Sequence, residues 1–423
     1  MSVLPLGWAE LPLSELAEVR LGRQRAPMNH SGDQMRPYLR AANVGWDGLQ
    51  LDDVKSMNFT DHEMATYRLA PGDLLLSEAS GSAGEVGKPA LWNGEVDDCA
   101  FQNTLLRVRA HGMEPRFLLH YFGFVALTGR FVEHSRGVGI HHLGRARLAS
   151  WPTPKPPADE QRRIVDILEG HLSRLDAGGR YLSDGLQRTR RWAAGVADLL
   201  LWEPGWPTHR LGTLLREPMR NGRSDRVVTG SSSGIRTLTL TAVTRNEFCS
   251  ANTKLTTTGA EVARELWLEP GDIFVQRANT PELVGTAALF NGPKNWAIFP
   301  DLLIRLRADE DLIHSRFLVA ALRSERSHRS LRAKAKGLAG SMPKVDQTTV
   351  AAIDIPLPPL SHQRTIIEEL EKTYFASTAL ATSLRSQEQR SNSLRRALLQ
   401  AAFSGKLTGR HTDIEVIEEL AGV

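Results

Sequence analysis

One stretch of the sequence occurs twice: Val86-Gly-Lys-Pro-Ala-Leu-Trp-Asn-Gly94 returns 198 residues later as Val284-Gly-Thr-Ala-Ala-Leu-Phe-Asn-Gly292. Extended to residues 86–110 and 284–308, the two copies share 11 identities in 25 positions. Pro-Gly-Asp at 71–73 also recurs at 270–272. Two unrelated domains with similar turns are the alternative. A repeat this long predicts two copies of one domain.

Each copy then passes through a proline-rich joint into an expected long helix. The prolines of 152–157 are followed by Gln161-Arg162, and those of 356–359 by Gln363-Arg364, 202 residues later. Apolar residues follow at heptad spacing in both segments, so we expect the two helices to pack antiparallel. The alternative is that each helix lies on its own domain. The predicted helix–helix packing residues are Ile164, Leu168, Leu175, Leu182, Trp192, Ile366, Leu370, Leu380, Leu384, Leu394 and Leu398.

The composition is that of an ordinary globular protein, with 41% hydrophobic and 24% charged residues. The net charge is only +4, so a nucleic-acid surface would have to come from local patches. Two isolated cysteines, Cys99 and Cys249, form neither a disulfide framework nor a zinc site. We find no signal peptide and no membrane-spanning run, and therefore expect a cytoplasmic protein without membrane contact.

Short strand-like segments fill each half of the chain. Leu74–Leu76 and Ile273–Val275 follow Pro-Gly turns, and Leu302–Leu306 alternates as a strand does. Residues 115–128 and 315–331 have helical patterns. The sequence therefore predicts an α+β fold: two mixed domains, mainly of antiparallel sheet, separated by a two-helix antiparallel coiled coil, with a pseudo-two-fold internal repeat.

Basic residues gather at equivalent places in the two halves, in 130–147 and 316–344. Each segment ends in a glycine-bearing loop, where cationic side chains can approach phosphates. A solvated charged face is the alternative, but the recurrence favours DNA binding. The residues predicted to contact phosphates are Arg136, His142, Lys334, Lys336 and Lys344.

Polar loop residues are candidates for reading base edges, because Arg pairs well with guanine and Asn or Gln with adenine. The candidates are Arg40, Asn43, Gln102, Asn103, Gln276, Arg277 and Asn279. Catalytic motifs are missing: we find no phosphate-binding loop, no nucleophile elbow and no amino-methyltransferase motif. A nuclease reading of Asp73, Glu85 and Lys88 fails because the second copy has Leu283 and Thr286 where the last two stand. We predict a non-catalytic chain with no catalytic residues and no metal site.

The two halves, the Pro-Gly-Asp strands and the segment Ile353-Asp-Ile-Pro-Leu-Pro-Pro-Leu-Ser-His-Gln-Arg-Thr-Ile resemble the specificity subunits of type I restriction–modification systems. The ending Leu394-Arg-Arg-Ala-Leu-Leu-Gln-Ala-Ala-Phe-Ser-Gly-Lys-Leu407 is similar to the C-terminal helix of that family. The expected domains are a target recognition domain at 1–155, a spacer helix at 156–204, a second recognition domain at 205–355, a second spacer helix at 356–408 and a tail at 409–423.

The resemblance implies that each half reads one part of a split site in double-stranded DNA. It implies that the helices set the spacing, about one DNA turn, and dock two modification (methyltransferase) subunits and restriction subunits. S-adenosylmethionine, ATP and Mg would bind those partners, so this chain is expected to bind no cofactor. Two parts of the first copy depart from the family pattern: its proline-rich joint at 151–157 and the end of its helix, Leu199-Leu-Leu-Trp-Glu203. Two other functions stay open: a stand-alone DNA-binding regulator and a helical-rod adaptor between proteins.

Overall fold

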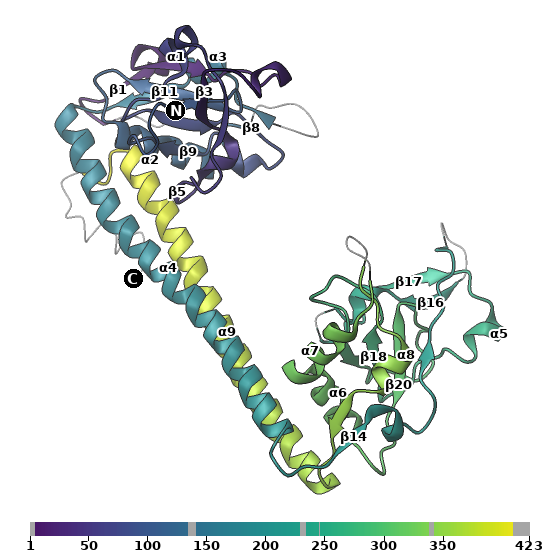
Figure 1. The fold of residues 1–423 in the computed structure, drawn as a ribbon. Coiled ribbons are helices and arrows are strands. Elements are labelled where there is room, and N and C mark those ends of the chain that lie inside the picture. The colour runs from purple at the N-terminus through teal and green to yellow at the C-terminus, as the bar shows by residue number, and fades with distance from the viewer. Residues whose placement is uncertain (1–4, 134–140, 229–233, 245, 338–341, 409–423) are drawn as a thin grey trace. The chain divides into compact units, whose positions relative to one another are not determined.

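The computed structural model describes residues 5–133, 141–228, 234–244, 246–337 and 342–408. The chain divides into two compact units (Figure 1). The first contains residues 1–182 and 386–423, and the second contains residues 183–385. Each unit therefore combines one mixed domain with parts of the two long helices, α4 (Ala158–Leu201) and α9 (Leu360–Phe403).

The first domain is built on a four-stranded antiparallel sheet in the order β2-β11-β7-β9. Helix α2 (Pro115–Leu127) packs on this sheet, and a smaller sheet, β10-β3-β6, adjoins it. Besides α2, the strands and α-helices of this domain, in chain order, are β1 (Ala9–Pro12), β2 (Ala17–Leu21), β3 (Met35–Leu39), β4 (Val44–Gly45), β5 (Gly48–Leu49), β6 (Lys55–Asn58), α1 (Asp61–Tyr67), β7 (Leu74–Ser77), β8 (Ala79–Ser80), β9 (Pro89–Leu91), β10 (Ala100–Phe101), β11 (Leu105–Ala110), β12 (His141–His142), α3 (Arg145–Ala149) and β13 (Pro152–Lys155).

The second domain repeats this plan with the sheet order β15-β20-β18-β19. The elements that it shares with the first domain occur in the same order, so the predicted internal repeat is confirmed. They are β14 (Thr208–Arg210), β15 (Arg220–Asn221), β16 (Ile235–Leu238), β17 (Thr253–Thr256), α5 (Ala260–Ala263), β18 (Asp272–Gln276), β19 (Ala287–Leu289), β20 (Leu303–Arg307), α6 (Ser315–Arg323), α7 (Glu325–Lys334), α8 (Gln347–Ala351) and β21 (Asp354–Pro356).

The repeated Pro-Gly-Asp turn places a buried carboxylate under each central strand. Asp73 is 1% exposed and binds the Arg109 guanidinium through both oxygens, each at 2.7 Å. Asp272 is equally buried and binds Arg307 at 2.6 and 3.4 Å. Gly72 and Gly271 precede these aspartates with φ of +91° and +93°, which favours glycine. The recurring residues are therefore a structural framework.

A buried glutamine fastens the first turn of each long helix to its domain. The Gln161 side chain accepts from the Glu114 N–H and donates to the Pro156 carbonyl, both at 2.8 Å. Gln363 accepts from the His314 N–H at 2.8 Å and donates to the carbonyls of Pro358 and Leu312 at 2.9 and 3.1 Å. The recurrence of glutamine at the two joints therefore has a hydrogen-bonding cause.

Contacts within each unit show that α4 and α9 pack together antiparallel, as predicted. In the first unit Asp176 forms an ion pair with Arg395, and Thr408 binds Glu160. In the second unit Gly185 lies against Leu384. Nearer the second domain, Leu201 and Ile366 belong to one apolar cluster. In these contacts, higher residue numbers in α4 face lower residue numbers in α9. The two helices are therefore antiparallel in both units.

The ends of the helices are buried more fully than their middles. Among the predicted packing residues, Ile164, Leu168, Ile366, Leu370 and Leu398 are buried in clusters that also contain residues of the domains. Each helix end therefore packs both on its domain and on the other helix, and the two predicted alternatives coexist. Leu175, Leu182, Leu384 and Leu394 are partly buried.

The prediction was wrong for Trp192 and Leu380, which are each 49% exposed. The seam in this part of the pair is formed instead by small residues, among them Thr189 and Ala193, which are buried. A strict heptad drifts by about 20° per repeat on a straight helix. The heptad frame that fits the start of α4 therefore places Trp192 to one side of the seam.

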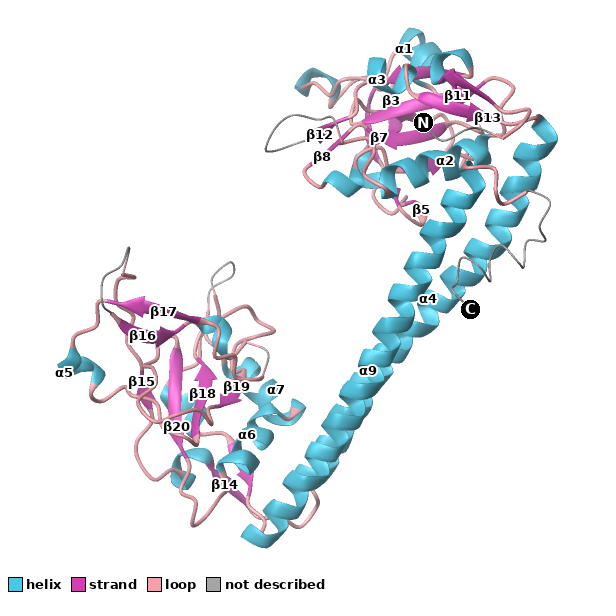
Figure 2. Ribbon diagram, turned by 180° about the vertical axis from the view of Figure 1, so that it is seen from behind, coloured by secondary structure: helices cyan, strands magenta, loops and turns pink. Residues whose placement is uncertain are grey.

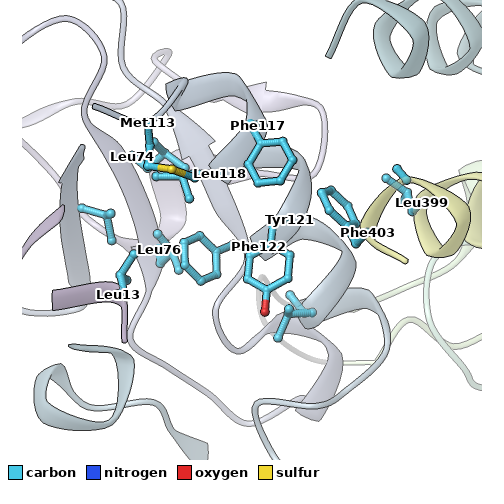
Figure 3. Packing of buried hydrophobic residues seen from close by; sticks show 14 of the residues in the cluster. Leu13, Leu74, Leu76, Met113, Phe117, Leu118, Tyr121, Phe122, Leu399 and Phe403 are labelled. Atoms are coloured by element: carbon cyan, nitrogen blue, oxygen red, sulfur yellow. The ribbon is translucent and has the colours of Figure 1, made fainter. Parts of the chain in front are cut away.

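The C-terminal end of α9 closes the core of the first domain (Figure 3). The Phe403 ring packs on α2, at 5.5 Å from the Phe117 ring, 5.3 Å from Tyr121 and 5.6 Å from Phe124. At the end of α4 the Trp202 indole donates to the Ser324 hydroxyl at 3.0 Å. Arg326 lies 4.3 Å above the same indole. α9 thus ends on α2 of the first domain, whereas Trp202, which follows α4, contacts the junction of α6 and α7 in the second.

Candidate nucleic-acid interface

Cationic residues of the second domain meet beside the end of α7. Lys334 is the last residue of that helix. Lys336 and Lys344 form a two-way backbone bridge, in which the Lys336 N–H donates at 2.8 Å and the Lys344 N–H at 2.9 Å. The three side chains are exposed. The structure therefore brings together three of the residues predicted to contact phosphates.

Asp346 lies next to this lysine group and faces Lys336, with its carboxylate 3.5 Å from the ammonium nitrogen. Hydrogen bonds from the Thr349 hydroxyl and backbone N–H lower the pKa of Asp346, and the nearby Lys336 lowers it further. The same carboxylate caps the N-terminus of α8. Asp346 therefore stays ionised and anchors the base of the lysine group.

Arg277 lies directly beside the two bridged lysines. It follows β18, and its carbonyl accepts a hydrogen bond from the Val345 N–H at 2.8 Å. The next residue, Ala278, forms an antiparallel bridge with Lys344. Among the described residues, no hydrogen-bond or ion-pair partner is found for the Arg277 side chain. Its guanidinium therefore remains a candidate for a base contact.

The prediction was wrong for Gln276, which is fully buried. Its amide donates to the Leu240 carbonyl at 3.0 Å and to the Thr244 hydroxyl at 2.9 Å. Asn279 donates to the Gln276 side-chain oxygen at 2.8 Å and accepts from the Thr280 N–H. The Gln276 side chain thus joins β18 to residues 240–244, and Asn279 bonds within the turn after β18, so these hydrogen-bonding groups are used inside the protein.

In the first domain, β8 and β12 pair antiparallel in the way that Ala278 and Lys344 pair in the second (Figure 2). Glu78 follows β7, and its carbonyl accepts from the Leu143 N–H at 2.8 Å. The His142 ring nitrogen Nδ1 lies 3.0 Å from a Glu78 carboxylate oxygen. The imidazole is largely exposed and keeps its place as a candidate phosphate contact. Arg136 lies outside the described residues.

Arg40 and Asn43 are held by the turn in which they stand. The prediction was wrong for Asn43, which is buried and donates to the carbonyls of Gln50 and Asp53 at 2.8 and 3.2 Å. Arg40 forms an ion pair with Asp53 at 2.7 Å. Hydrogen bonding from Lys55, together with the Arg40 charge, lowers the pKa of Asp53. Arg40 would have to leave this carboxylate to contact a base.

Gln102 and Asn103 lie on the connection between β10 and β11, where the chain passes close to Gly22. Their backbone N–H groups donate to Leu39 and Arg23 carbonyls at 2.9 and 3.0 Å. The two side chains are partly exposed and form no side-chain hydrogen bond with any residue that the structure describes. They remain predictions.

Sequence reasoning missed Glu78. A carboxylate next to a strand is unremarkable by itself, and its partner His142 is 64 residues away. The available signal was the repeat, because Glu78 and Arg277 stand 199 residues apart, as do the two Pro-Gly-Asp turns. At these equivalent positions the two copies therefore carry opposite charges.

Two searches of the described residues gave negative findings. No group of three or more His, Cys, Asp or Glu side chains in this part of the chain is placed to hold a metal ion. Within the same residues, no helix combines the length and apolarity needed to cross a bilayer.

Comparison with known proteins gives consistent matches. Residues 5–178 match the family model of the type I restriction modification DNA specificity domain. The chain is 25% identical to the StySPI specificity subunit of Salmonella potsdam over 431 residues, covering 96% of this chain and 90% of that protein. It is 22% identical to the EcoKI specificity subunit of Escherichia coli K12, with the same coverage.

Solved structures agree with this fold. One, from work on the assembly and conformational transition of a type I restriction–modification system, has a TM-score of 0.74 at 18% identity. The similarity covers 96% of this chain and all of that one. The HsdS subunit of Thermoanaerobacter tengcongensis has a TM-score of 0.52 at 20% identity, covering 96% and 98% of the two chains.

Proposed function

Because this chain belongs to the specificity subunits of type I restriction–modification systems, we propose that it reads an asymmetric DNA site of two separated parts. Each recognition domain contacts one part. The proposal is supported by the two loop edges, which have one backbone plan but different side chains: Glu78 with His142 in the first domain, and Arg277 with Lys344 in the second. Unlike side chains on like backbones favour unlike half-sites.

The chain supplies recognition, and its partners supply the chemistry. It is a non-catalytic subunit, and it assembles with modification and restriction subunits. We propose that two modification subunits dock on the helices, bind S-adenosylmethionine and methylate adenine. ATP and Mg belong to the restriction subunits. The complex works in the cytoplasm, where its DNA is found.

The paired helices α4 and α9 are proposed to set the spacing between the two parts of the DNA site. Each helix has 44 residues, which corresponds to about 66 Å at about 1.5 Å per residue. The Gln161 and Gln363 joints fasten each helix start to its domain. Matched insertion of one helical turn in both helices is expected to lengthen the spacer and leave both half-sites unchanged.

A genome-wide map of methylated adenines, made with and without this gene, tests the function directly. The expected result is a split motif that is present with the gene and disappears on its deletion. Complementation with the intact chain restores that motif and provides the control. An unchanged map would overturn the proposal.

The salt dependence of DNA binding separates this function from the two alternatives. Binding through several phosphates weakens steeply with salt, whereas a protein–protein adaptor is almost indifferent to DNA. Titration of the assembled complex at two salt concentrations is expected to show the steep loss. Full sequence-specific binding by the chain alone, unchanged by modification subunits, would instead favour a stand-alone regulator.

A further inference from the structure

The residue that directly follows the Pro-Gly-Asp strand occupies the same place in both recognition domains. Glu78 follows β7, and Arg277 follows β18. In each case its carbonyl accepts a hydrogen bond at 2.8 Å from the residue just after a short partner segment, Leu143 or Val345. The backbone of these two positions is thus fixed by the same pair of strands, and only the side chain differs.

The partner segment adds a cationic or titratable side chain beside each of these residues. His142 pairs with Ala79, the neighbour of Glu78, and Lys344 bridges to Ala278, the neighbour of Arg277. The pair is Glu78 with His142 in the first domain and Arg277 with Lys344 in the second. The repeat therefore places an anion and a cation at one equivalent point of two DNA-reading edges.

A carboxylate at such a point has a restricted choice of DNA groups. Phosphates repel it, and among base edges in the major groove it accepts hydrogen bonds best from the cytosine amino group. The Glu78 side chain is 16% exposed, and the His142 ring beside it is 61% exposed. The carboxylate oxygens have lone pairs left after the contact with His142, because each can accept more than one hydrogen bond.

The guanidinium of Arg277 has the opposite preference. Arg bonds guanine O6 and N7 together, which is the commonest specific contact in the major groove. Lys344 and Lys336 flank Arg277 and are suited to the neighbouring phosphates, which position a protein on DNA without reading its sequence. Within the described residues no side-chain partner competes for Arg277.

We propose that Glu78 and Arg277 are equivalent specificity-determining residues, with Glu78 selecting a cytosine in one half-site and Arg277 a guanine in the other. The inference deepens the proposed function and rests on it. The asymmetry of the target then arises in part from one reversal of charge at one repeated position.

The test uses the full chain assembled with its modification subunits and a DNA library randomised across both half-sites. Methylated molecules are sequenced for the parent and for Arg277→Ala and Glu78→Gln. Each variant is expected to lose about 5- to 150-fold discrimination at one base pair, as one good base contact provides. Arg277→Ala changes only the second half-site. Glu78→Gln changes only the first, where the glutamine amide can bond adenine as well as cytosine.

Matched variants separate base reading from other roles. Arg264→Ala, at the residue just after α5 and paired only with Glu261 among the described residues, is expected to leave both half-sites unchanged. Lys336→Ala is expected to lower methylation of all sequences together. If His142→Ala relaxed the first half-site as much as Glu78→Gln, Glu78 would only position the histidine, and the assignment would be overturned.

The outcomes distinguish this inference from the function on which it rests. A parent complex that yields no split motif contradicts the proposed function. A parent motif that persists unchanged in Arg277→Ala and Glu78→Gln contradicts the inference alone. Thermal unfolding of each variant shows whether it still folds. Arg277→Gln, which keeps a long polar side chain, provides a second test of the base preference at residue 277.

Discussion

The first recognition domain has Glu78 and His142 where the second has Arg277 and Lys344, yet beneath these residues the two domains agree closely. The sheet orders β2-β11-β7-β9 and β15-β20-β18-β19 correspond strand by strand. The buried Asp73–Arg109 pair has its counterpart in Asp272–Arg307. Repetition is therefore concentrated in the groups that hold the strands, and divergence in the side chains at the loop edge.

The difference teaches how one fold can read two sequences. A framework that depends on buried charges tolerates little change, because removal of one partner leaves the other uncompensated. A side chain just beyond the end of a strand is not part of a buried ion pair, so it can be replaced without leaving a buried charge unpaired. Substitutions in the framework should thus affect the two domains similarly, and substitutions at the edge should affect them differently.

Loss of the buried aspartate is expected to have the largest effect. Asp73→Ala and Asp272→Ala each remove a carboxylate that is 1% exposed and leave an arginine without its main partner. We expect each to cost about 3–5 kcal/mol of unfolding free energy. Urea denaturation followed by tryptophan fluorescence measures the loss. A large effect in one domain and none in the other would contradict the shared framework.

Substitutions at the C-terminal ends of the two long helices should have the next largest effect on stability, and the loss should differ between the two ends. Phe403→Ala removes a ring packed against Phe117, Tyr121 and Phe124, which should cost about 3 kcal/mol. Trp202→Ala at the end of α4 should cost less, because this indole is only partly buried. Thermal unfolding of the two variants gives the comparison. Equal losses would show that the two helix ends contribute alike despite their different sequences.

The buried glutamines allow a finer comparison. Gln161→Leu removes two hydrogen bonds and Gln363→Leu removes three, and each leaves a backbone N–H without its acceptor. A buried unsatisfied group costs about 1–3 kcal/mol, so Gln363→Leu should be the more damaging. Urea midpoints of the two variants measure the difference. A larger loss for Gln161→Leu would contradict this hydrogen-bond account.

The smallest expected effect is a gain. Helix α4 contains five glycines, whereas α9 contains none between Leu360 and Phe403. A Cβ at Gly178 would meet nothing within 4 Å, so Gly178→Ala should stabilise the helix by about 0.5–1 kcal/mol. Circular dichroism during heating records the shift. Gly185→Ala is the matched control at a position where the two helices touch, since its Cβ would lie 3.4 Å from the Leu384 side chain.

The sequence was sufficient to predict the repeat, the long helices and their antiparallel pairing. Each of these depends on a pattern with a physical period or on a repeated turn, such as Pro71-Gly-Asp73. The heptad was less reliable in the middle of α4, where Thr189 and Ala193 are buried and Trp192 is exposed. A seam of small residues has little hydrophobic signal, although it permits close approach of two helices.

The residues that are candidates for base contacts were harder to predict, because a polar loop side chain can bond either to DNA or to its own protein. Asn43 bonds to carbonyls 7 and 10 residues away, whereas Gln276 bonds to Leu240 and Thr244, which are more than 30 residues away. Nothing in the local sequence of either residue distinguishes these internal bonds from an outward contact. Arg277 differs in having no such partner among the described residues. That distinction depends on long-range neighbours, so it required the structure.

The glycine content of α4 also bears on how the chain is made. Residues 158–201 leave the ribosome about 200 residues before their counterparts in α9, which at about 5–20 residues per second is a delay of about 10–40 s. Gly170, Gly178, Gly179, Gly185 and Gly195 keep the nascent segment a poor helix during that interval. Synthesis of the last helix thus completes the first one, and a truncated chain would expose an unpaired apolar stripe to aggregation.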